Sequence, residues 1–125
     1  AVSCDGIDDY LVGNVSGTTL TDFTIEAFIR TDAIPQASKG ILQWANNLGD
    51  GTPMVYFQQS SSNLDVYVNS NYNLSAPLVL NSWNHVALSY STGVYKLYIN
   101  GSLVSTYNGG ITNQANANKI FIGKI

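Results

Sequence analysis

The sequence of 125 residues predicts an all-β protein, a two-sheet antiparallel β-sandwich. Two observations favour this fold. Apolar and polar residues alternate over short segments bounded by turn formers, and no segment keeps a 3.6-residue apolar period for the length of a helix. A tight Asn100-Gly101 pair also joins two segments rich in β-branched and aromatic residues. We expect about ten short strands in a single domain, residues 1–125.

The stretch from Trp83 to Tyr107 is predicted to form three consecutive antiparallel strands. Asn100-Gly101 tolerates positive φ at both positions, so it suits a two-residue type I′ turn. That turn would place Leu97 opposite Val104. Burial of one apolar face then selects a four-residue loop before the hairpin, which pairs Leu88 with Leu97.

The remaining strands follow from the same alternation. In Phe23–Arg30, Ile25 and Ile29 belong to the apolar face, and Glu26 belongs to the polar one. The lone Cys4 is expected to be a small buried residue of the first strand. Strands are expected at residues 1–4, 9–12, 23–30, 40–45, 54–58, 64–68, 76–80, 84–90, 95–99, 102–106 and 119–122.

Charge and hydropathy exclude two classes of partner. Only 10% of the residues are charged, the net charge is −3, and the five basic residues are scattered. Nucleic acid is therefore not an expected partner, because no basic patch can neutralise phosphates. No apolar run approaches the ~20 residues that a membrane-spanning helix needs, so no membrane span is expected.

Four motifs occur in order along the chain: DGIDDY at Asp5–Tyr10, FTIEAFI at Phe23–Ile29, WNHVA…LYING at Trp83–Gly101 and IFIG at Ile120–Gly123. Together they resemble laminin-G-like, concanavalin A-like jelly-roll domains. In that family a further strand follows the last motif, whereas this sequence ends at Ile125. The resemblance therefore implies self-association, or strand addition, at the edge left by the missing C-terminal strand.

Catalysis is not expected. Glycoside hydrolases need two positioned carboxyl groups, and the enzymes that the chain resembles carry them in an E-x-D-x-x-E pattern. This chain has one glutamate, Glu26, outside any such pattern. The single His85 has no partner for metal or nucleophilic chemistry nearby in the sequence, which favours a structural role.

Calcium is the possible cofactor. Asp5, Asp8 and Asp9 cluster in a glycine-containing turn, and calcium takes about six to eight oxygen ligands from carboxylates and carbonyls. The spacing is not that of an EF-hand. The alternative is that these aspartates only cap the turn through side-chain hydrogen bonds to the backbone.

Carbohydrate is the expected ligand class, by resemblance. Aromatic faces can stack on sugar rings while polar groups bond the hydroxyls. The candidates beside predicted loops are Trp44, Asp50, Tyr72 and Trp83. Alternatively, most aromatic rings are simply strand residues. We expect a non-enzymatic binding or adhesion module, secreted or on a virion surface, that contacts a glycan or protein surface. The alternative is a structural assembly protein, such as a virion decoration, capsid-associated or fibre subunit.

Overall fold

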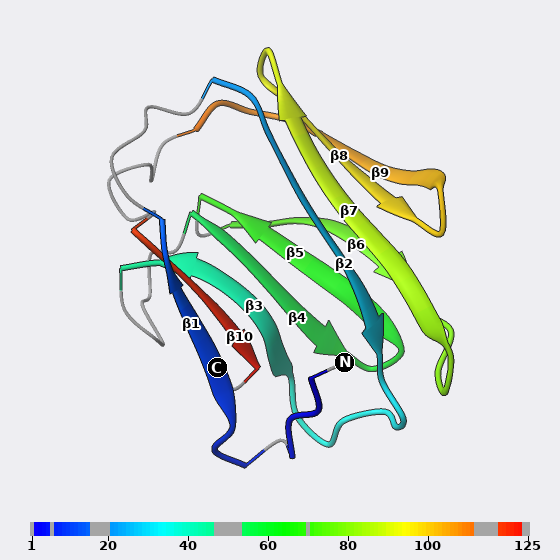
Figure 1. Ribbon diagram of the computed structural model, residues 1–125. Coiled ribbons are helices and arrows are strands. Elements are labelled where there is room, and N and C mark those ends of the chain that lie inside the picture. Colours follow the sequence, from blue (N-terminus) through cyan, green and yellow to red (C-terminus); the bar gives the residue numbers. More distant parts are fainter. Residues whose placement is uncertain are drawn as a thin grey trace.

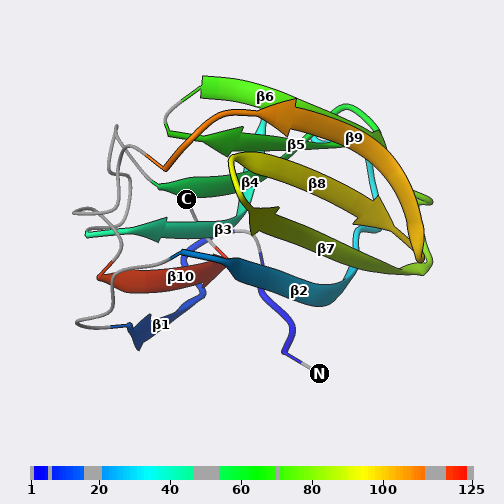
Figure 2. The ribbon, with the colours of Figure 1, turned by 90° about the horizontal axis from the view of Figure 1, so that it is seen from above.

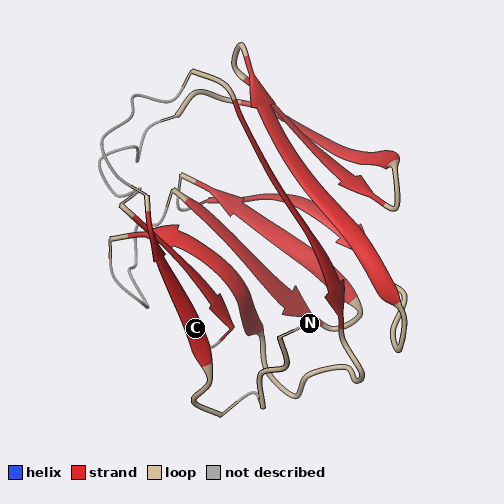
Figure 3. Cartoon of the chain, viewed as in Figure 1, coloured by secondary structure: helices blue, strands red, loops and turns tan. Residues whose placement is uncertain are grey.

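The computed structural model describes residues 2–5, 7–15, 21–46, 54–69, 71–111 and 118–123, except for the side chains of Tyr72 and Asn73. All regular elements in these ranges are strands, which confirms the all-β prediction (Figures 1 and 3). Ten strands are described: β1 (Tyr10–Asn14), β2 (Phe23–Arg30), β3 (Lys39–Ala45), β4 (Val55–Ser60), β5 (Asn63–Val68), β6 (Asn71–Pro77), β7 (Trp83–Ser91), β8 (Val94–Ile99), β9 (Ser102–Asn108) and β10 (Lys119–Gly123).

The strands form two antiparallel sheets that pack face to face. One sheet has six strands in the order β1-β10-β3-β4-β5-β6, and the other has four in the order β2-β7-β8-β9. Alternate residues of both sheets point inward and bury a continuous apolar core, which includes Phe57, Leu64, Val66, Leu88, Tyr95 and Leu97. β6 lies against β8 and β9, and at the opposite end of the sandwich β1 extends past β2 (Figure 2).

The central three strands confirm most of the predicted register. Leu88 stands opposite Leu97, and both side chains are fully buried. Asn100 and Gly101 have φ of 50° and 84°, as a type I′ turn requires. The predicted contact between Leu97 and Val104 is wrong: Leu97 stands opposite Ser105, and Val104 is 42% exposed.

A β-bulge explains that difference. The pairing of β8 with β9 shifts between Leu97 and Tyr98, so β9 holds one extra residue. The shift places Tyr107, in place of Thr106, opposite Tyr95. The rings of Tyr95 and Tyr107 then lie 6.1 Å apart, so the bulge turns Val104 outward and adds an aromatic ring beside the core.

Two other predicted boundaries are corrected. Residues 2–5 form no strand, and Cys4 is exposed rather than buried. β6 begins at Asn71, earlier than the predicted strand at 76–80, because the chain reverses directly after Asn69, whose φ is 52°. Asn71 therefore already pairs with Val68. The strand of the last motif, β10, has partners on both sides, β1 and β3.

Candidate functional site

Two rows of polar and aromatic side chains cross the outer face of the six-stranded sheet. Inward positions of β3–β6 carry the apolar core, so the residues between them point outward. Strand pairing aligns these outward residues from strand to strand. The first row contains Phe121, Gln43, Tyr56 and Tyr67, and the second contains Gln58, Asp65 and Ser75.

The first row presents two tyrosine rings side by side. The rings of Tyr56 and Tyr67 lie 5.7 Å apart at an interplanar angle of 36°, and both side chains are half-buried. Gln58 donates a hydrogen bond from Nε2 to the hydroxyl oxygen of Tyr67 over 3.2 Å, which links this row to the second. Burial, and secondarily the neighbouring Tyr67, raises the pKa of Tyr56 above its usual value of 10.0.

The second row is built around a buried carboxylate. Asp65 is only 5% exposed although it points away from the core. Its Oδ1 accepts a hydrogen bond from Ser75 Oγ at 2.9 Å, and its Oδ2 accepts one from Ser60 Oγ. A buried carboxylate is costly unless it is hydrogen-bonded, and these hydroxyls supply the bonds. The polar groups of this face are therefore held in fixed positions by one another.

Of the four residues that the sequence suggested for sugar binding, the structure does not bring Trp44 and Trp83 together. Trp44 is 5% exposed and packs edge-on against Phe23 at 5.4 Å, so its ring offers no face to a ligand. Trp83 is 53% exposed, but it lies on the four-stranded sheet. Tyr72 lies in β6 with its backbone opposite Tyr67, and Asp50 lies outside the described residues.

Sequence analysis missed the face itself. The signal was present in the alternation of VYFQQS and NLDVYV, where Tyr56, Gln58, Asp65 and Tyr67 occupy every second position. Alternation alone shows that such residues share a face of one strand. That the two sets lie directly opposite one another depends on the pairing of β4 with β5.

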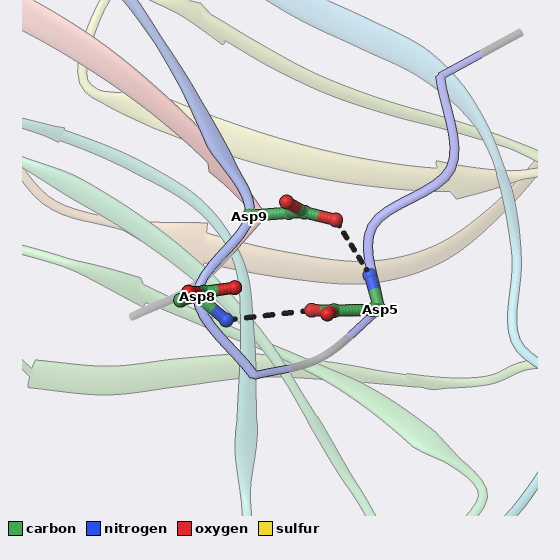
Figure 4. A group of neighbouring side chains, drawn as sticks. All are labelled: Asp5, Asp8 and Asp9. Atoms are coloured by element: carbon green, nitrogen blue, oxygen red, sulfur yellow. Dashed lines mark hydrogen bonds between the residues drawn. The ribbon is translucent and has the colours of Figure 1, made fainter.

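The acidic turn before β1 brings its three carboxylates together, with ligand atoms within 4.8 Å of one another (Figure 4). Asp5 Oδ1 accepts hydrogen bonds from the backbone N–H of Ile7 at 2.7 Å and of Asp8 at 3.3 Å. Asp9 Oδ2 accepts one from the N–H of Asp5 at 3.2 Å. The bond from Ile7 is the main cause of the lowered pKa of Asp5. The turn thus shows the capping bonds expected of the alternative, and it leaves other carboxylate oxygens for a cation.

A cleft of about 690 Å³ opens beside β2, at the end of the sandwich where β1 extends past the four-stranded sheet. Its lining is mostly apolar and includes Ile29 from β2 and Leu11 and Ile122 from β1 and β10. The segment Val2–Cys4 borders the cleft as well. Thr31 Oγ1, in the same lining, is buried and has no hydrogen-bond partner within the described part of the chain.

Solved structures with the same fold include sugar-related proteins. A Bacteroides ovatus protein, provisionally assigned to carbohydrate binding, is 26% identical over 91% of this chain and 34% of its own, with a TM-score of 0.68. Botulinum neurotoxin type C, whose cell entry depends on two ganglioside molecules, is 17% identical over 93% of this chain and 32% of its own, with a TM-score of 0.72. Trypanosoma rangeli sialidase is 14% identical over 83% of this chain and 17% of its own, with a TM-score of 0.64.

This chain therefore spans at most about a third of each of these three proteins. Among curated proteins, none matches it. The described ranges contain no helix that is long and apolar enough to cross a membrane. The sequence profile of the concanavalin A-like lectin/glucanases superfamily matches residues 5–124, nearly the whole chain. With the ten-strand sandwich, this match shows that the chain belongs to the concanavalin A-like lectin/glucanase superfamily.

Proposed function

We propose that this chain is a non-catalytic glycan-binding module and that the outer face of the six-stranded sheet holds the sugar. The observation that carries the proposal is the pair of tyrosine rings, Tyr56 and Tyr67, set beside hydrogen-bonded polar side chains. Sugar rings present apolar C–H faces and a rim of hydroxyls. A flat aromatic surface with fixed donors and acceptors is complementary to both.

Preorganisation supports this face over the alternatives. Binding loses affinity when flexible side chains must be ordered, and here Tyr67 and Asp65 are already held by Gln58 and by Ser75. Exposed rings also occur on the other sheet, where Phe28 and Trp83 lie among charged residues. Their flanking groups are ion-paired, as in the 3.0 Å contact between Arg30 and Asp32.

The absence of catalysis is part of the proposal. In β3–β6 the sequence holds one carboxylate, Asp65, and hydrolysis of a glycosidic bond commonly needs two. The single glutamate, Glu26, lies on the other sheet, with Oε2 at 3.4 Å from His85 Nε2. His85 also contacts the ring of Phe28, at 4.9 Å between ring centroids.

A glycan array tests the proposed function directly. Wild-type protein should bind a restricted set of oligosaccharides, and a variant with both Tyr56→Ala and Tyr67→Ala should lose that binding while keeping the wild-type circular dichroism spectrum. Failure of the folded wild-type protein to bind any glycan, with or without calcium, would exclude the proposal. Secreted or virion-surface placement fits a module that meets glycans outside cells, and we propose that setting.

A second candidate function, assembly by strand addition, is favoured by the cleft. β2 is an edge strand, so one side of its backbone has no strand partner among the described residues. β1, which extends past β2, would obstruct a second sheet at this edge. We therefore propose that a single extended segment occupies the cleft, whose lining includes β2 and Val2–Cys4. Such a segment would cover the apolar lining and could satisfy Thr31 Oγ1. Soluble peptides with alternating valines, added in trans, should raise the melting temperature if the cleft accepts a strand.

Calcium is proposed only for the acidic turn. Among the described residues of the turn, no hydrogen bond uses a carboxylate oxygen of Asp8, and the bonds of Asp5 and Asp9 each use one of their two carboxylate oxygens. These oxygens fit a hard cation that keeps several water ligands. The proposed sugar-binding face does not require this ion.

A further inference from the structure

We infer that the ligand of the six-stranded sheet is an uncharged glycan and that this face discriminates against glycans carrying carboxylates. The inference rests on the proposed function. Its basis is the charge of the face itself: the only charged outward-facing group in β3–β6 is the carboxylate of Asp65.

The position of Asp65 gives it influence over a bound sugar. It lies two residues from Tyr67 on the same face of β5, which separates the two Cα atoms by about 7 Å. A sugar stacked on Tyr67 would therefore carry its substituents close to Asp65. The carboxylate is held in place by Ser60 and Ser75, so it cannot swing away to relieve repulsion.

No nearby cation offsets this charge in the described strands. Lys39 lies at the start of β3, opposite Gln59, and Gln59 shares the inward side of β4 with Phe57. Lys119 does share the outer face, but it belongs to β10, three strands away from β5. Three strand spacings amount to about 14 Å, beyond the screening length of about 8 Å at physiological ionic strength.

The polar partners around the tyrosines suit hydroxyl groups. Gln58 offers amide donors and an acceptor, and the hydroxyl of Tyr56 can both donate and accept a hydrogen bond. Recognition of a carboxylate characteristically uses arginine, which binds it with two parallel hydrogen bonds. The single arginine, Arg30, lies on β2 and is bonded to Asp32. The face can therefore bond hydroxyls and has no described group that compensates an anionic sugar.

The test uses matched glycans. Gluco-, galacto- and manno-oligosaccharides would be compared with counterparts oxidised at C6 to the uronate, each titrated calorimetrically into wild-type protein. Within each pair that the protein binds, we expect the neutral glycan to bind about tenfold more tightly than the uronate at low salt. Repulsion between two negative charges about 5–7 Å apart gives an effect of this order. Raising the salt concentration from about 0.02 M to about 0.5 M should reduce the difference in affinity between the neutral glycan and the uronate, because salt screens the repulsion.

Two variants of equal net charge locate the effect. Asp65→Asn should reduce the preference for the neutral glycan, whereas Asp32→Asn, which removes a charge on the other sheet, should leave it unchanged. If Asp65→Asn fails to fold, the salt dependence of the neutral-glycan preference, measured in the wild-type protein, still tests whether charge repulsion causes that preference. Equal or tighter binding of the uronates by wild type would overturn the inference and leave glycan binding standing. Binding of neither member of any pair would overturn the proposed function itself.

Discussion

The amide of Gln58 donates a hydrogen bond to the hydroxyl of Tyr67 over 3.2 Å, across the boundary between two neighbouring strands. This bond links the aromatic row to the carboxylate row. It fixes the direction of the tyrosine hydroxyl and leaves the ring beside that of Tyr56. The geometry of the proposed binding face is therefore set by contacts between β4 and β5 before any ligand arrives.

Removal of the Ser75 hydroxyl should destabilise the protein, because the buried carboxylate of Asp65 loses a hydrogen bond. Ser75→Ala deletes the 2.9 Å hydrogen bond to Asp65, which is almost fully buried. A buried acceptor that loses a partner costs about 1–3 kcal/mol, so we expect a loss of unfolding free energy in that range. Urea denaturation measures it. Ser91→Ala, at the exposed end of β7, is the matched control and should be nearly neutral. Equal stability of the two variants would show that water replaces the lost hydroxyl.

Leu97 lies in the core, whereas the β-bulge turns Val104 to the surface. Leu97 is fully buried opposite Leu88, so Leu97→Ala should lower the unfolding free energy by about 2–5 kcal/mol. Val104 points outward, so Val104→Ala should cost about 0.5 kcal/mol or less. Chemical denaturation of both variants compares them directly. A large loss in Val104→Ala would contradict the bulged register and support the unbulged one.

High pH should destabilise the protein through Tyr95. Burial, with lesser contributions from Tyr90 and Tyr107, raises the pKa of Tyr95 to about 12, above its usual value of 10.0. The phenol loses its proton more easily in the unfolded chain than in the native one. The stabilisation is therefore fully present below pH 10 and is lost as the pH rises towards about 12.

The matched variant for this effect is Tyr95→Phe, which also removes the 3.3 Å bond from the Tyr95 hydroxyl to the carbonyl of Gly110. Its unfolding free energy should be lower than that of wild type at pH 8 and should fall less steeply above pH 10. Urea denaturation across this range measures both slopes. Parallel slopes would mean that Tyr95 titrates alike in the native and unfolded chains.

Calcium should raise the melting temperature if the acidic turn binds it, because a ligand held only by the native state stabilises that state. Asp8→Asn is the sharpest variant, since it removes one charge and breaks no side-chain bond of the turn. We expect millimolar calcium to stabilise wild type and to have a smaller effect on Asp8→Asn. Asp22→Asn is the control of equal charge. An identical response of all three proteins to calcium and to chelator would rule out this turn as the site.

The sequence predicts the core of this protein better than it predicts the surface. Two-residue alternation identified β2 and the pairing of Leu88 with Leu97, because burial of one face admits a single register. It did not reveal the bulge beside Val104, because Leu103 and Val104 are adjacent apolar residues and the pattern alone does not decide which of them faces the core. Trp44 was expected near a loop surface, but its position on the inward side of β3 buries it against Phe23. The row formed by Tyr56 and Tyr67 depends on pairing between strands, which no single segment encodes.

The most direct test of the central claim is calorimetric titration of a glycan that wild type binds on the array. Tyr67→Ala removes one ring of the proposed site, and Trp83→Ala removes an exposed ring from the opposite sheet. Stacking of one aromatic ring contributes about 1 kcal/mol, so loss of Tyr67 should weaken binding at least about fivefold. Trp83→Ala should bind as wild type does. Unchanged affinity in Tyr67→Ala together with lost affinity in Trp83→Ala would contradict the account and move the site to the four-stranded sheet.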